Sequence, residues 1–275
     1  MTTSRAERAF NYTVLAIFSV IAAFPLLGVV WLGLRVRTTD VMGIPVPTGA
    51  SFGAIAEAWQ RGHFATYLTN SAFVVVVVVL VAVLLSILAG YALGTMDLPG
   101  GNALFYLFLL GLMVPTEALV IPLFFDLRSF GLDNSFPGLI LPQIAQSLSF
   151  GTFWMRAYFR SVPGSLIEAA RMDGAGSWTT LWRVLVPVGR PAVVTMIVLI
   201  FMWTWNEFLL ALVIMGSRED LRTAPLGLSF FQGQFVSDYD LLAAGAGIVA
   251  LPVMVVYVFL QRHFIAGMLS GALKE

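Results

Sequence analysis

The sequence predicts an all-α membrane protein with six transmembrane helices. Its mean hydropathy is +0.90 and only 11% of its 275 residues are charged, against about a quarter in an ordinary soluble domain. So few charges cannot cover the surface of a soluble fold, and most of the surface must therefore face lipid. Backbone polar groups in lipid must pair within their own segment or within a closed barrel, and the period-two alternation of barrel strands is absent. The spans are therefore predicted to be helices.

Six long apolar stretches account for these helices. The clearest is "SAFVVVVVVLVAVLLSILAGYALG", which contains no charged residue. Its valines favour a β-strand, but strands are typically about 5–6 residues long, whereas this run at about 1.5 Å per residue exceeds the roughly 30 Å hydrocarbon core. The first stretch is too long for the core of a cleaved signal peptide and is predicted to be retained. The six predicted spans are residues 12–34, 71–94, 103–126, 136–158, 190–215 and 239–262. Together they predict a single transmembrane domain over residues 1–275.

The distribution of Lys and Arg predicts the orientation. Six spans place both termini on the same side, together with the loop at residues 159–189. Nine of the 15 Lys and Arg residues lie on that side and six on the other. The nine are Arg5, Arg8, Arg156, Arg160, Arg171, Arg183, Arg190, Arg262 and Lys274. Positive residues are enriched in cytoplasmic loops, so both termini and this loop are predicted to be cytoplasmic.

Composition excludes several kinds of chemistry. The chain has no cysteine, which excludes disulfides and thiolate ligands, and its two histidines, His63 and His263, have no companions at metal-ligand spacing. Its single lysine, Lys274, does not lie in the glycine-rich turn that a P-loop requires. Lys plus Arg equals Asp plus Glu, 15 each, which gives no basic excess for nucleic acid. No nucleophile–base set or pair of catalytic carboxylates stands out. The chain is predicted to be no enzyme and to bind no metal or nucleotide itself.

The loop at residues 159–189 contains a short polar helix. In "VPGSLIEAARMDGAG", Ser165 is predicted to cap the helix and to form a capping box with Glu168, and Gly174 is predicted to end it. A second, amphipathic helix is predicted over residues 177–187. The first helix has about two turns, which is too short for stability alone in water. It either packs under its own bundle or gains its stability from a partner.

This loop resembles the EAA loop of ABC importer permeases. The family pattern is EAA, three residues, Gly, nine residues, then Ile, any residue, Leu and Pro. Here residues 168–170 and Gly174 match, and the segment "VLVP" at 184–187 differs only by two conservative valines. Four further segments are similar, in order, to landmarks of the maltose-type branch, in particular its second, MalG-like subunit: "YLTNSAFV", "MVPTEALVIPLF", "WNEFLLAL" and "FIAGMLSGALK".

The resemblance implies a fold, a mechanism and partners. The fold is that of a type I ABC importer permease with a cytoplasmic coupling helix between spans four and five. That helix docks on a separate ATPase, which binds ATP and Mg²⁺. The ATPase rocks the permease between inward-open and outward-open states. The docking residues are Glu168, Ala169, Ala170, Asp173 and Gly174.

The implied partners are a second, MalF-like permease subunit, two copies of the cytoplasmic ATPase and an extracytoplasmic substrate-binding protein. Such complexes import carbohydrates or sugar derivatives through the bacterial cytoplasmic membrane. The resemblance further implies that the outer loop between spans five and six contacts the binding protein. It also implies that the tail at residues 264–274 contacts the ATPase.

Two acids lie inside predicted spans. An acid near the membrane centre costs roughly 2.5–3.5 kcal/mol on insertion scales, so Glu117 and Glu207 should face the bundle interior, water or a partner. They are solvated near the outer interface, line a transport pathway or subunit seam, or relay protons. Pro115 and Pro122 are predicted to break the third span around Glu117.

Aromatic and polar side chains together suit a sugar, whose apolar ring face stacks while its hydroxyls need polar partners. The candidates for such a pathway are Asn70, Glu117, Trp203, Trp205, Asn206 and Glu207. The tryptophans equally suit an interfacial aromatic belt. A proton-coupled secondary transporter using Glu117 and Glu207 is the alternative function, although such a carrier has no reason to keep a coupling loop.

Overall fold

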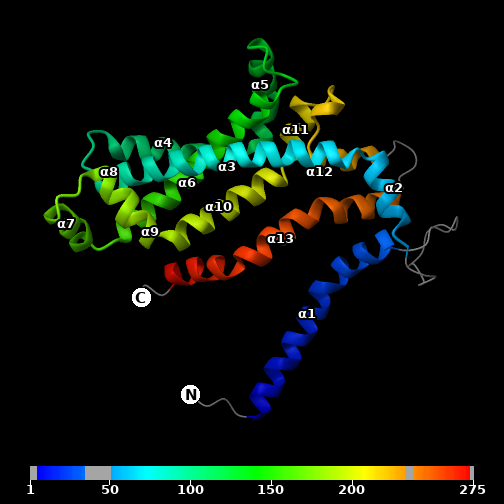
Figure 1. Ribbon diagram of the computed structural model, residues 1–275, viewed down its shortest axis with the longest axis horizontal. Coiled ribbons are helices and arrows are strands. Elements are labelled where there is room, and N and C mark those ends of the chain that lie inside the picture. The colour runs from blue at the N-terminus through cyan, green and yellow to red at the C-terminus, as the bar shows by residue number, and fades with distance from the viewer. Residues whose placement is uncertain (1–4, 35–50, 233–237, 273–275) are drawn as a thin grey trace. The chain divides into compact units, whose positions relative to one another are not determined.

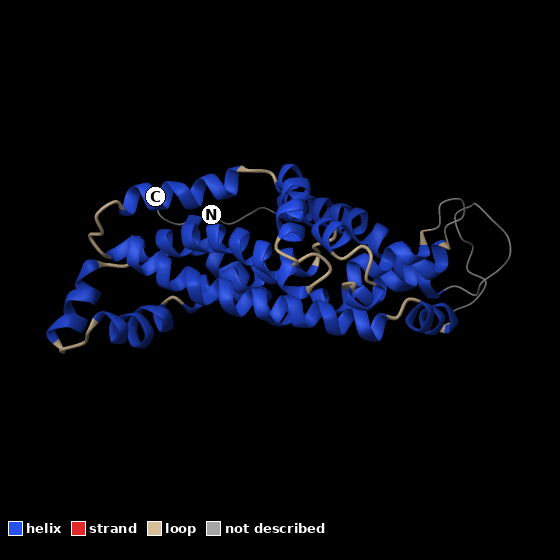
Figure 2. Cartoon of the chain, turned by 90° about the horizontal axis from the view of Figure 1, so that it is seen from above, coloured by secondary structure: helices blue, strands red, loops and turns tan. Residues whose placement is uncertain are grey.

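The computed structural model describes residues 5–34, 51–232 and 238–272, with residues 262–272 described by their backbone alone. Every element of regular structure in these residues is a helix (Figure 2), which confirms the predicted all-α class. The side chains of the expected ATPase-contacting tail lie outside the described residues. The chain forms two compact units, one of Met1–Ala65 with Gly227–Leu251 and one of Thr66–Leu226 with Pro252–Glu275.

The first unit contains α1 (Arg5–Leu34), α2 (Gly53–Arg61), the 3₁₀ turn η3 (Leu228–Phe231) and the first part of α13 (Tyr239–Ala272). The Phe64 ring stacks on the Phe231 ring with centroids 6.2 Å apart. Most of α1 exposes its apolar side chains, among them Phe18 and Phe24. Exposed apolar side chains along a whole helix are typical of a surface that contacts lipid or a partner.

The second unit holds the remaining helices. They are α3 (Phe64–Thr95), α4 (Gly101–Met113), α5 (Thr116–Ser129), α6 (Phe136–Ser161), α7 (Gly164–Met172), α8 (Ser177–Thr179), the π-helical turn η1 (Thr180–Leu185), α9 (Val186–Val188), α10 (Arg190–Trp205), α11 (Leu209–Ile214), the 3₁₀ turn η2 (Glu219–Leu221) and α12 (Ala224–Gly227). α6 is central, because both α4 and α10 pack against it.

Small residues bring α3 and α6 into close contact. Gly90 and Gly94 lie four residues apart on α3, a spacing that lets helix backbones approach in membranes. A Cβ atom at Gly90 would lie 2.5 Å from Met155 Cβ and 2.9 Å from the Arg156 backbone nitrogen, and one at Gly94 would lie 3.1 Å from Phe159 Cβ. Met155 and Phe159 are almost fully buried. α3 and α6 are therefore closely packed at Gly90 and Gly94.

Arg156 of α6 also stabilises this contact, near the C-terminal end of α3. Its Nε donates to the Leu93 carbonyl at 3.0 Å, its Nη2 donates to Asn102 Oδ1 at 3.1 Å, and its guanidinium lies 3.7 Å from the centroid of the Phe105 ring. The last carbonyls of α3 lack partners within the helix and carry partial negative charge, which Arg156 satisfies. The orientation prediction counted Arg156 among the loop charges. This is wrong, because Arg156 lies within α6 and is only 8% exposed.

The six predicted spans are only partly recovered. Among the described residues, three helices are long and apolar enough to cross a membrane: Glu7–Leu34, Phe64–Thr95 and Tyr239–Gln261. Two bent pairs, Gly101–Met113 with Thr116–Ser129 and Ser177–Val188 with Arg190–Trp205, raise the number to five if each pair is one span. The predicted span 136–158 is helical within α6, but it is not among these candidates. Its middle carries Gln143, Gln146 and several hydroxyls, which lower its hydropathy. The six-span topology stays a prediction.

Two predicted spans are broken helices. α4 and α5 meet at 98° around Val114 and Pro115, and Figure 1 shows α5 standing steeply off α4. The predicted break at Pro115 is confirmed, whereas Pro122 lies inside α5 without ending it. The predicted span 190–215 stops at Trp205 and resumes at Leu209 as α11. Each break places a carboxylate near the start of the following helix.

Candidate functional site: a coupling helix and a polar cavity

α7 is a nine-residue helix with two different faces. Its inner face carries Leu166 and Ile167, which pack against the hydrophobic core, and Ala170, which is 7% exposed. Its outer face exposes Glu168, Ala169, Met172 and Asp173. The inner spacing of i, i+1 and i+4 is that of a helix lying on a protein surface. Its own bundle therefore supports α7 on one face and leaves the other face open.

One of the expected docking residues is buried, and a residue outside that set is exposed. Ala170 is buried, so its methyl group packs inward and does not belong to the outer face. Met172, in contrast, is 87% exposed and was missed. The signal in the sequence was a large apolar side chain four residues after Glu168 within an otherwise polar helix. The docking role of the outer face stays a prediction.

α7 starts differently from the prediction but ends where it was predicted to end. The helix begins at Gly164 with Pro163 in the cap position and no side-chain cap, so the predicted capping box of Ser165 and Glu168 is wrong. Proline preorganises the entry to a helix without needing an N–H donor. The predicted end at Gly174 is confirmed, because Gly174 has φ +79°.

Gly174 completes a Schellman motif. Its backbone N–H donates to the Arg171 carbonyl at 3.0 Å, and the Ala175 N–H donates to the Ala170 carbonyl at 2.9 Å. These bonds satisfy carbonyls that a helix end otherwise leaves without partners. Glycine is suited to this position because a positive φ brings a Cβ atom into conflict with the backbone. The turn fixes the last residue of α7, Met172, and the C-cap residue Asp173 at the end of the outer face.

The predicted second helix is present but is not a regular α-helix. Residues 177–188 form α8, the π-helical turn η1 and α9 in succession. Leu181 and Leu185 of the predicted apolar face are buried, whereas Trp178 is 66% exposed. π-helical turns inside helices are rare and frequently accompany functional sites. This segment and α7 together form the part of the loop that reaches out from the bundle.

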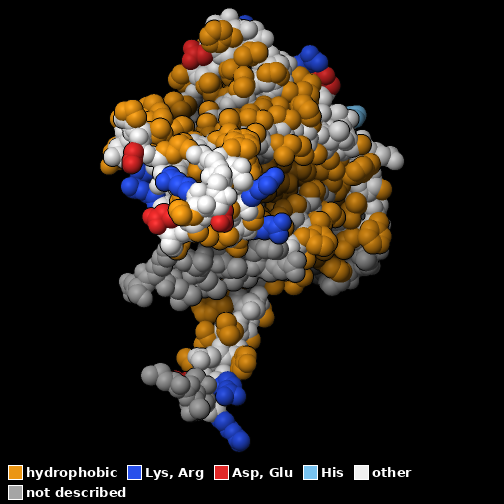
Figure 3. Space-filling view, turned by 60° about the vertical axis from the view of Figure 1, so that its left-hand side comes forward, with side chains coloured by type: hydrophobic (Ala, Val, Ile, Leu, Met, Phe, Trp, Pro, Cys, Tyr) orange, Lys and Arg blue, Asp and Glu red, His pale blue; other side chains and the backbone are white. Residues whose placement is uncertain are grey.

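Charged side chains surround the loop at residues 159–189. Figure 3 shows Lys, Arg, Asp and Glu side chains gathered around the protruding loop, with mainly hydrophobic side chains beside it. The exposed charged residues here are Arg160, Glu168, Arg171, Asp173, Arg183 and Arg190. Such a mixed polar surface next to an apolar one is typical of the boundary between lipid and water.

The loop is connected to α10 through a sharp bend at Gly189. The segments on either side of it meet at 80°. The Tyr158 hydroxyl on α6 donates to the Leu185 carbonyl at 2.9 Å, and the Trp154 indole N–H donates to the Ala192 carbonyl at 3.0 Å. α6 thus holds both sides of the bend. The end of the loop and the start of α10 are therefore both anchored to the same helix.

Replacing Gly189 with alanine is expected to loosen this bend. A Cβ atom there would overlap the Tyr158 ring, and moving the ring breaks its bond to Leu185. Overpacking of this kind typically costs about 1–3 kcal/mol. Limited trypsin digestion in detergent should cleave the loop at Arg171 and Arg183 several times faster than in the wild type. Gly176→Ala is the control, because no atom lies within 4 Å of a Cβ atom there. Equal digestion rates for all three proteins would contradict the role of this contact.

A cavity of about 500 Å³ lies within the second unit, between α6, α10 and the two helix breaks. This volume falls in the range of small-molecule sites. Its polar lining residues are Thr116, Glu117, Gln143, Gln146, Ser147, Thr204, Asn206 and Glu207. Its apolar lining residues are Leu112, Phe150, Leu199, Met202, Trp203 and Leu209. Four of the six predicted pathway residues therefore share one cavity: Glu117, Trp203, Asn206 and Glu207.

The two helix breaks position the two carboxylates. Glu117 lies in the first turn of α5. Glu207 lies in the break before α11, where its Oε1 accepts a hydrogen bond from the Leu210 backbone N–H at 2.7 Å. Negative side chains are favourable at such helix starts. Glu207 therefore has a structural role as a helix cap in addition to lining the cavity.

Aromatic rings and amides complete the cavity wall. Trp203 is 51% exposed and meets Phe150 edge to face, with centroids 4.7 Å apart. Gln146 donates to the Thr116 hydroxyl and thereby connects α6 with α5. Gln143 is 5% exposed. Both glutamines were missed, although two amides three residues apart in an apolar predicted span are a readable signal for a polar interior face.

Trp205 and Asn70 do not line this cavity, and their role in a pathway stays a prediction. Trp205 is 4% exposed and stacks on Phe201 with centroids 5.8 Å apart. It points away from Trp203 because side chains two residues apart on a helix face different sides. Trp205 therefore packs in the core.

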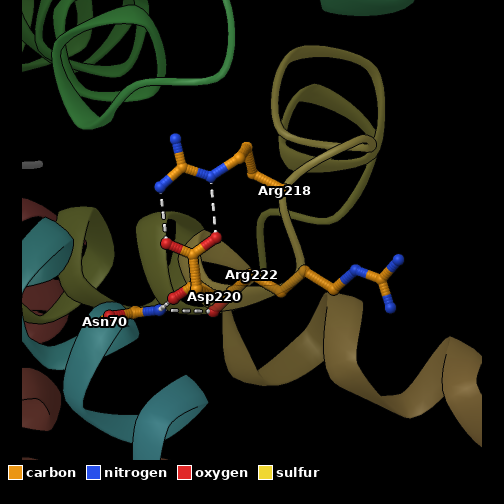
Figure 4. Close-up of polar contacts among 4 residues, drawn as sticks. All are labelled: Asn70, Arg218, Asp220 and Arg222. Carbon is orange, nitrogen blue, oxygen red and sulfur yellow. Dashed lines mark hydrogen bonds and ion pairs between the residues drawn. The ribbon is translucent and has the colours of Figure 1, made fainter.

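Asn70 instead connects the loop before α12 to α3 (Figure 4). Its Nδ2 donates to the Asp220 carbonyl at 2.8 Å and to the Arg222 carbonyl at 3.0 Å. The neighbouring Ser71 hydroxyl accepts from the Ala224 backbone N–H at 2.8 Å. Two consecutive polar side chains, Asn70 and Ser71, therefore hold residues 220–224.

The same loop contains an exposed ion pair. Arg218 donates to both carboxylate oxygens of Asp220, with its Nε at 2.7 Å from Oδ1 and its Nη2 at 2.6 Å from Oδ2. Hydrogen bonding by Arg218 lowers the pKa of the Asp220 carboxyl. Both side chains are exposed to solvent, so the pair contributes little to stability.

Two named relatives are similar to this chain over almost its whole length. The chain is 34% identical over 274 residues to the diacetylchitobiose uptake system permease protein NgcG of Streptomyces coelicolor, covering 98% of this chain and 90% of that protein. It is also 34% identical over 274 residues to the trehalose transport system permease protein SugB of Mycobacterium tuberculosis, covering 98% of this chain and 99% of that protein.

A solved structure shares the fold. It is a chain of a bacterial ABC transporter involved in the import of the acidic polysaccharide alginate, with a TM-score of 0.80 at 24% identity over 96% of this chain and 99% of that chain. Residues 82–270 match the family described as binding-protein-dependent transport system inner membrane component. This range includes α7, the bend at Gly189 and every residue that lines the cavity. The chain therefore belongs to the family of inner membrane components of binding-protein-dependent transport systems.

Proposed function

We propose that this chain is a permease subunit of an ATP-driven importer, and that it moves a carbohydrate or sugar derivative into the cytoplasm. The observation that carries the proposal is the continuous connection from α7 through the bend at Gly189 to α10, because α10 also lines the polar cavity. The relatives named for diacetylchitobiose uptake and trehalose transport support the substrate class. The chain itself hydrolyses nothing.

In this proposal a separate cytoplasmic ATPase docks on the outer face of α7. Glu168, Ala169 and Asp173 provide its polar and close-packed part, and Met172 provides an apolar anchor. Gly174 fixes the geometry of the face. When the ATPase moves α7, the contacts of Tyr158 and Trp154 transmit the displacement to α10 and so to the cavity wall. Such a lever needs differential binding of ATPase states to two bundle conformations.

The proposed complex contains two ATPase copies, which bind ATP and Mg²⁺, and a second permease subunit, of the MalF-like type. It also contains an extracytoplasmic binding protein, in keeping with the family description. Both termini and α7 lie on the cytoplasmic side, and six spans cross the membrane. The exposed apolar surfaces of α1 and α4 face lipid or the second permease.

Cysteine cross-linking tests the docking face, because the chain has no native cysteine. In the assembled complex, Ala169→Cys is expected to cross-link to a cysteine in the ATPase groove. The matched control is Ala170→Cys on the next position, whose buried side chain should not react. Equal yields at the two positions, or none at Ala169, would refute docking on this face.

Reconstituted uptake tests the energy source. Proteoliposomes that hold the whole complex should accumulate labelled trehalose or diacetylchitobiose only with ATP, and vanadate should stop the accumulation. The alternative is a proton-coupled carrier, which Glu117 and Glu207 favour by sharing one cavity. That alternative predicts uptake without ATP that collapses when an uncoupler is added.

A further inference from the structure

Gln143 carries a polar group that the fold leaves unsatisfied. The residue is 5% exposed on α6, and its Nε2 donates to the Leu139 carbonyl at 3.2 Å. Its Oε1 is buried and has no hydrogen-bond partner among the described residues. The opposite amide orientation would set Oε1 against the Leu139 carbonyl, so the orientation is fixed by that bond. An unpaired buried acceptor is unfavourable, and a ligand donor at this place removes the penalty.

The cavity in which Gln143 lies offers acceptors and no cation. Two carboxylates, Glu117 and Glu207, line it, and Oε1 of Glu207 is already engaged by a backbone N–H. No Lys, Arg or His is found among the described residues that line it. Hydroxyl groups can donate to such a wall, whereas carboxylate or phosphate groups of a ligand meet like charge at short range. The electrostatics of the cavity therefore favour a hydroxylated ligand without negative charge.

Trp203 supplies the complementary apolar surface. Its half-exposed ring is held edge to face by Phe150 and lies in the same cavity as the acceptors. An aromatic face beside hydrogen-bonding groups matches a pyranose ring, which has one apolar face and a hydroxylated rim. Residues from α6, α10 and both helix breaks thus converge on one ligand volume.

We propose that this chain has its own subsite for one uncharged sugar unit, and that the subsite rejects acidic sugars. The sugar ring stacks on Trp203, one hydroxyl donates to Gln143 Oε1, and others donate to Glu117 and Glu207. Oε1 is covered in the present conformation, so its bond forms as the cavity wall adjusts around the ligand. This proposal rests on the proposed function for the delivery of sugar to the cavity, and binding measurements test it separately.

The test uses the purified permease–ATPase complex without the binding protein, so that this subsite and not the binding protein determines the result. Equilibrium dialysis measures the binding of labelled trehalose and labelled diacetylchitobiose, with an alginate disaccharide as the acidic competitor. Gln143→Leu is expected to weaken the binding of the neutral sugar about fivefold to tenfold through loss of the hydrogen bond. Trp203→Ala should weaken it at least as much. Glu117→Gln should make the acidic disaccharide a better competitor.

Two control variants separate the subsite from general damage. Thr152→Val removes another buried side-chain oxygen of α6 that has no partner among the described residues, but Thr152 does not line the cavity. Phe130→Ala removes an exposed ring, 76% accessible, that also lies outside the cavity. Neither change should alter sugar binding.

The outcomes are distinguishable. The subsite is overturned if both Gln143→Leu and Trp203→Ala bind the neutral sugars as the wild type does. It is also overturned if the wild type binds the alginate disaccharide as tightly as the neutral sugars. Failure of both neutral disaccharides to bind overturns it as well. ATP-driven uptake is measured on the same preparation with the binding protein added back. Uptake with an unchanged binding pattern in the variants refutes only the subsite, whereas the expected binding pattern without ATP-driven uptake refutes only the proposed function.

Discussion

Replacing Gly174 with valine is expected to reduce ATP-dependent uptake by the assembled transporter about tenfold or more. The residue has φ +79°, and forcing a side chain into the left-handed region costs roughly 1–2 kcal/mol, with β-branched residues at the high end. A penalty of one to two kcal/mol shifts a two-state equilibrium by about 5–30-fold. α7 has only nine residues and its last turn depends on the bonds at Gly174 and Ala175. The change therefore frays the turn that carries Met172 and Asp173.

Uptake into proteoliposomes and co-purification of the ATPase are the measurements for this variant. Gly174→Asn is the matched control, because asparagine accepts the left-handed conformation better than other residues with a side chain. It should retain most of the transport. Near-normal uptake by Gly174→Val, or an equal loss in both variants, would show that the end of α7 is not what couples the chain to its ATPase.

Replacing Gly90 with leucine is expected to destabilise the fold strongly. The new Cβ atom alone would lie 2.9 Å from the Arg156 backbone nitrogen, and backbone cannot move aside as a flexible side chain does. Overpacking in a core typically costs about 1–3 kcal/mol and occasionally more, and separating α3 from α6 also strains the bonds of Arg156 to Leu93 and Asn102. The cost should fall at the high end of this range. The variant should elute as an aggregate in size-exclusion chromatography, or show a midpoint of thermal unfolding lowered by several degrees.

Gly28→Leu on α1 is the control for that variant. No atom lies within 4 Å of a Cβ atom at Gly28, so the same change in size and hydropathy is made without a clash. It should behave as the wild type does. If Gly90→Leu were as stable as Gly28→Leu, the close approach of α3 and α6 would not be needed for the fold.

The helices were the easiest part to predict from the sequence. Apolar runs such as that at residues 71–94 are long enough to be helical wherever they pack, and this stretch lies inside α3 as expected. Gly174 was predicted as a helix end for a similar reason, because glycine at that point permits a local conformation that other residues resist. Local rules failed at the other end of α7, where Pro163 and not Ser165 occupies the N-cap position.

The candidate site was predicted in part. Glu117 and Glu207 stood out because acids are rare in spans, and both line the cavity. Asn70 and Trp205 looked equally suitable by type, yet one ties a loop to α3 and the other packs in the core. Residue type limits what a side chain can contact, but its direction depends on neighbours that are distant in the sequence.

The sequence by itself determined that this chain is a helical membrane protein, where its polar loop lies and which family it resembles. These properties follow from composition, run length and local spacing. Only the tertiary structure decided that α4 and α5 break at 98°, that Gly189 accommodates Tyr158, and that Gln143 shares a cavity with Glu117 and Glu207. The physical reason is that packing and hydrogen bonding between helices depend on contacts across long stretches of chain, and no local pattern specifies these contacts.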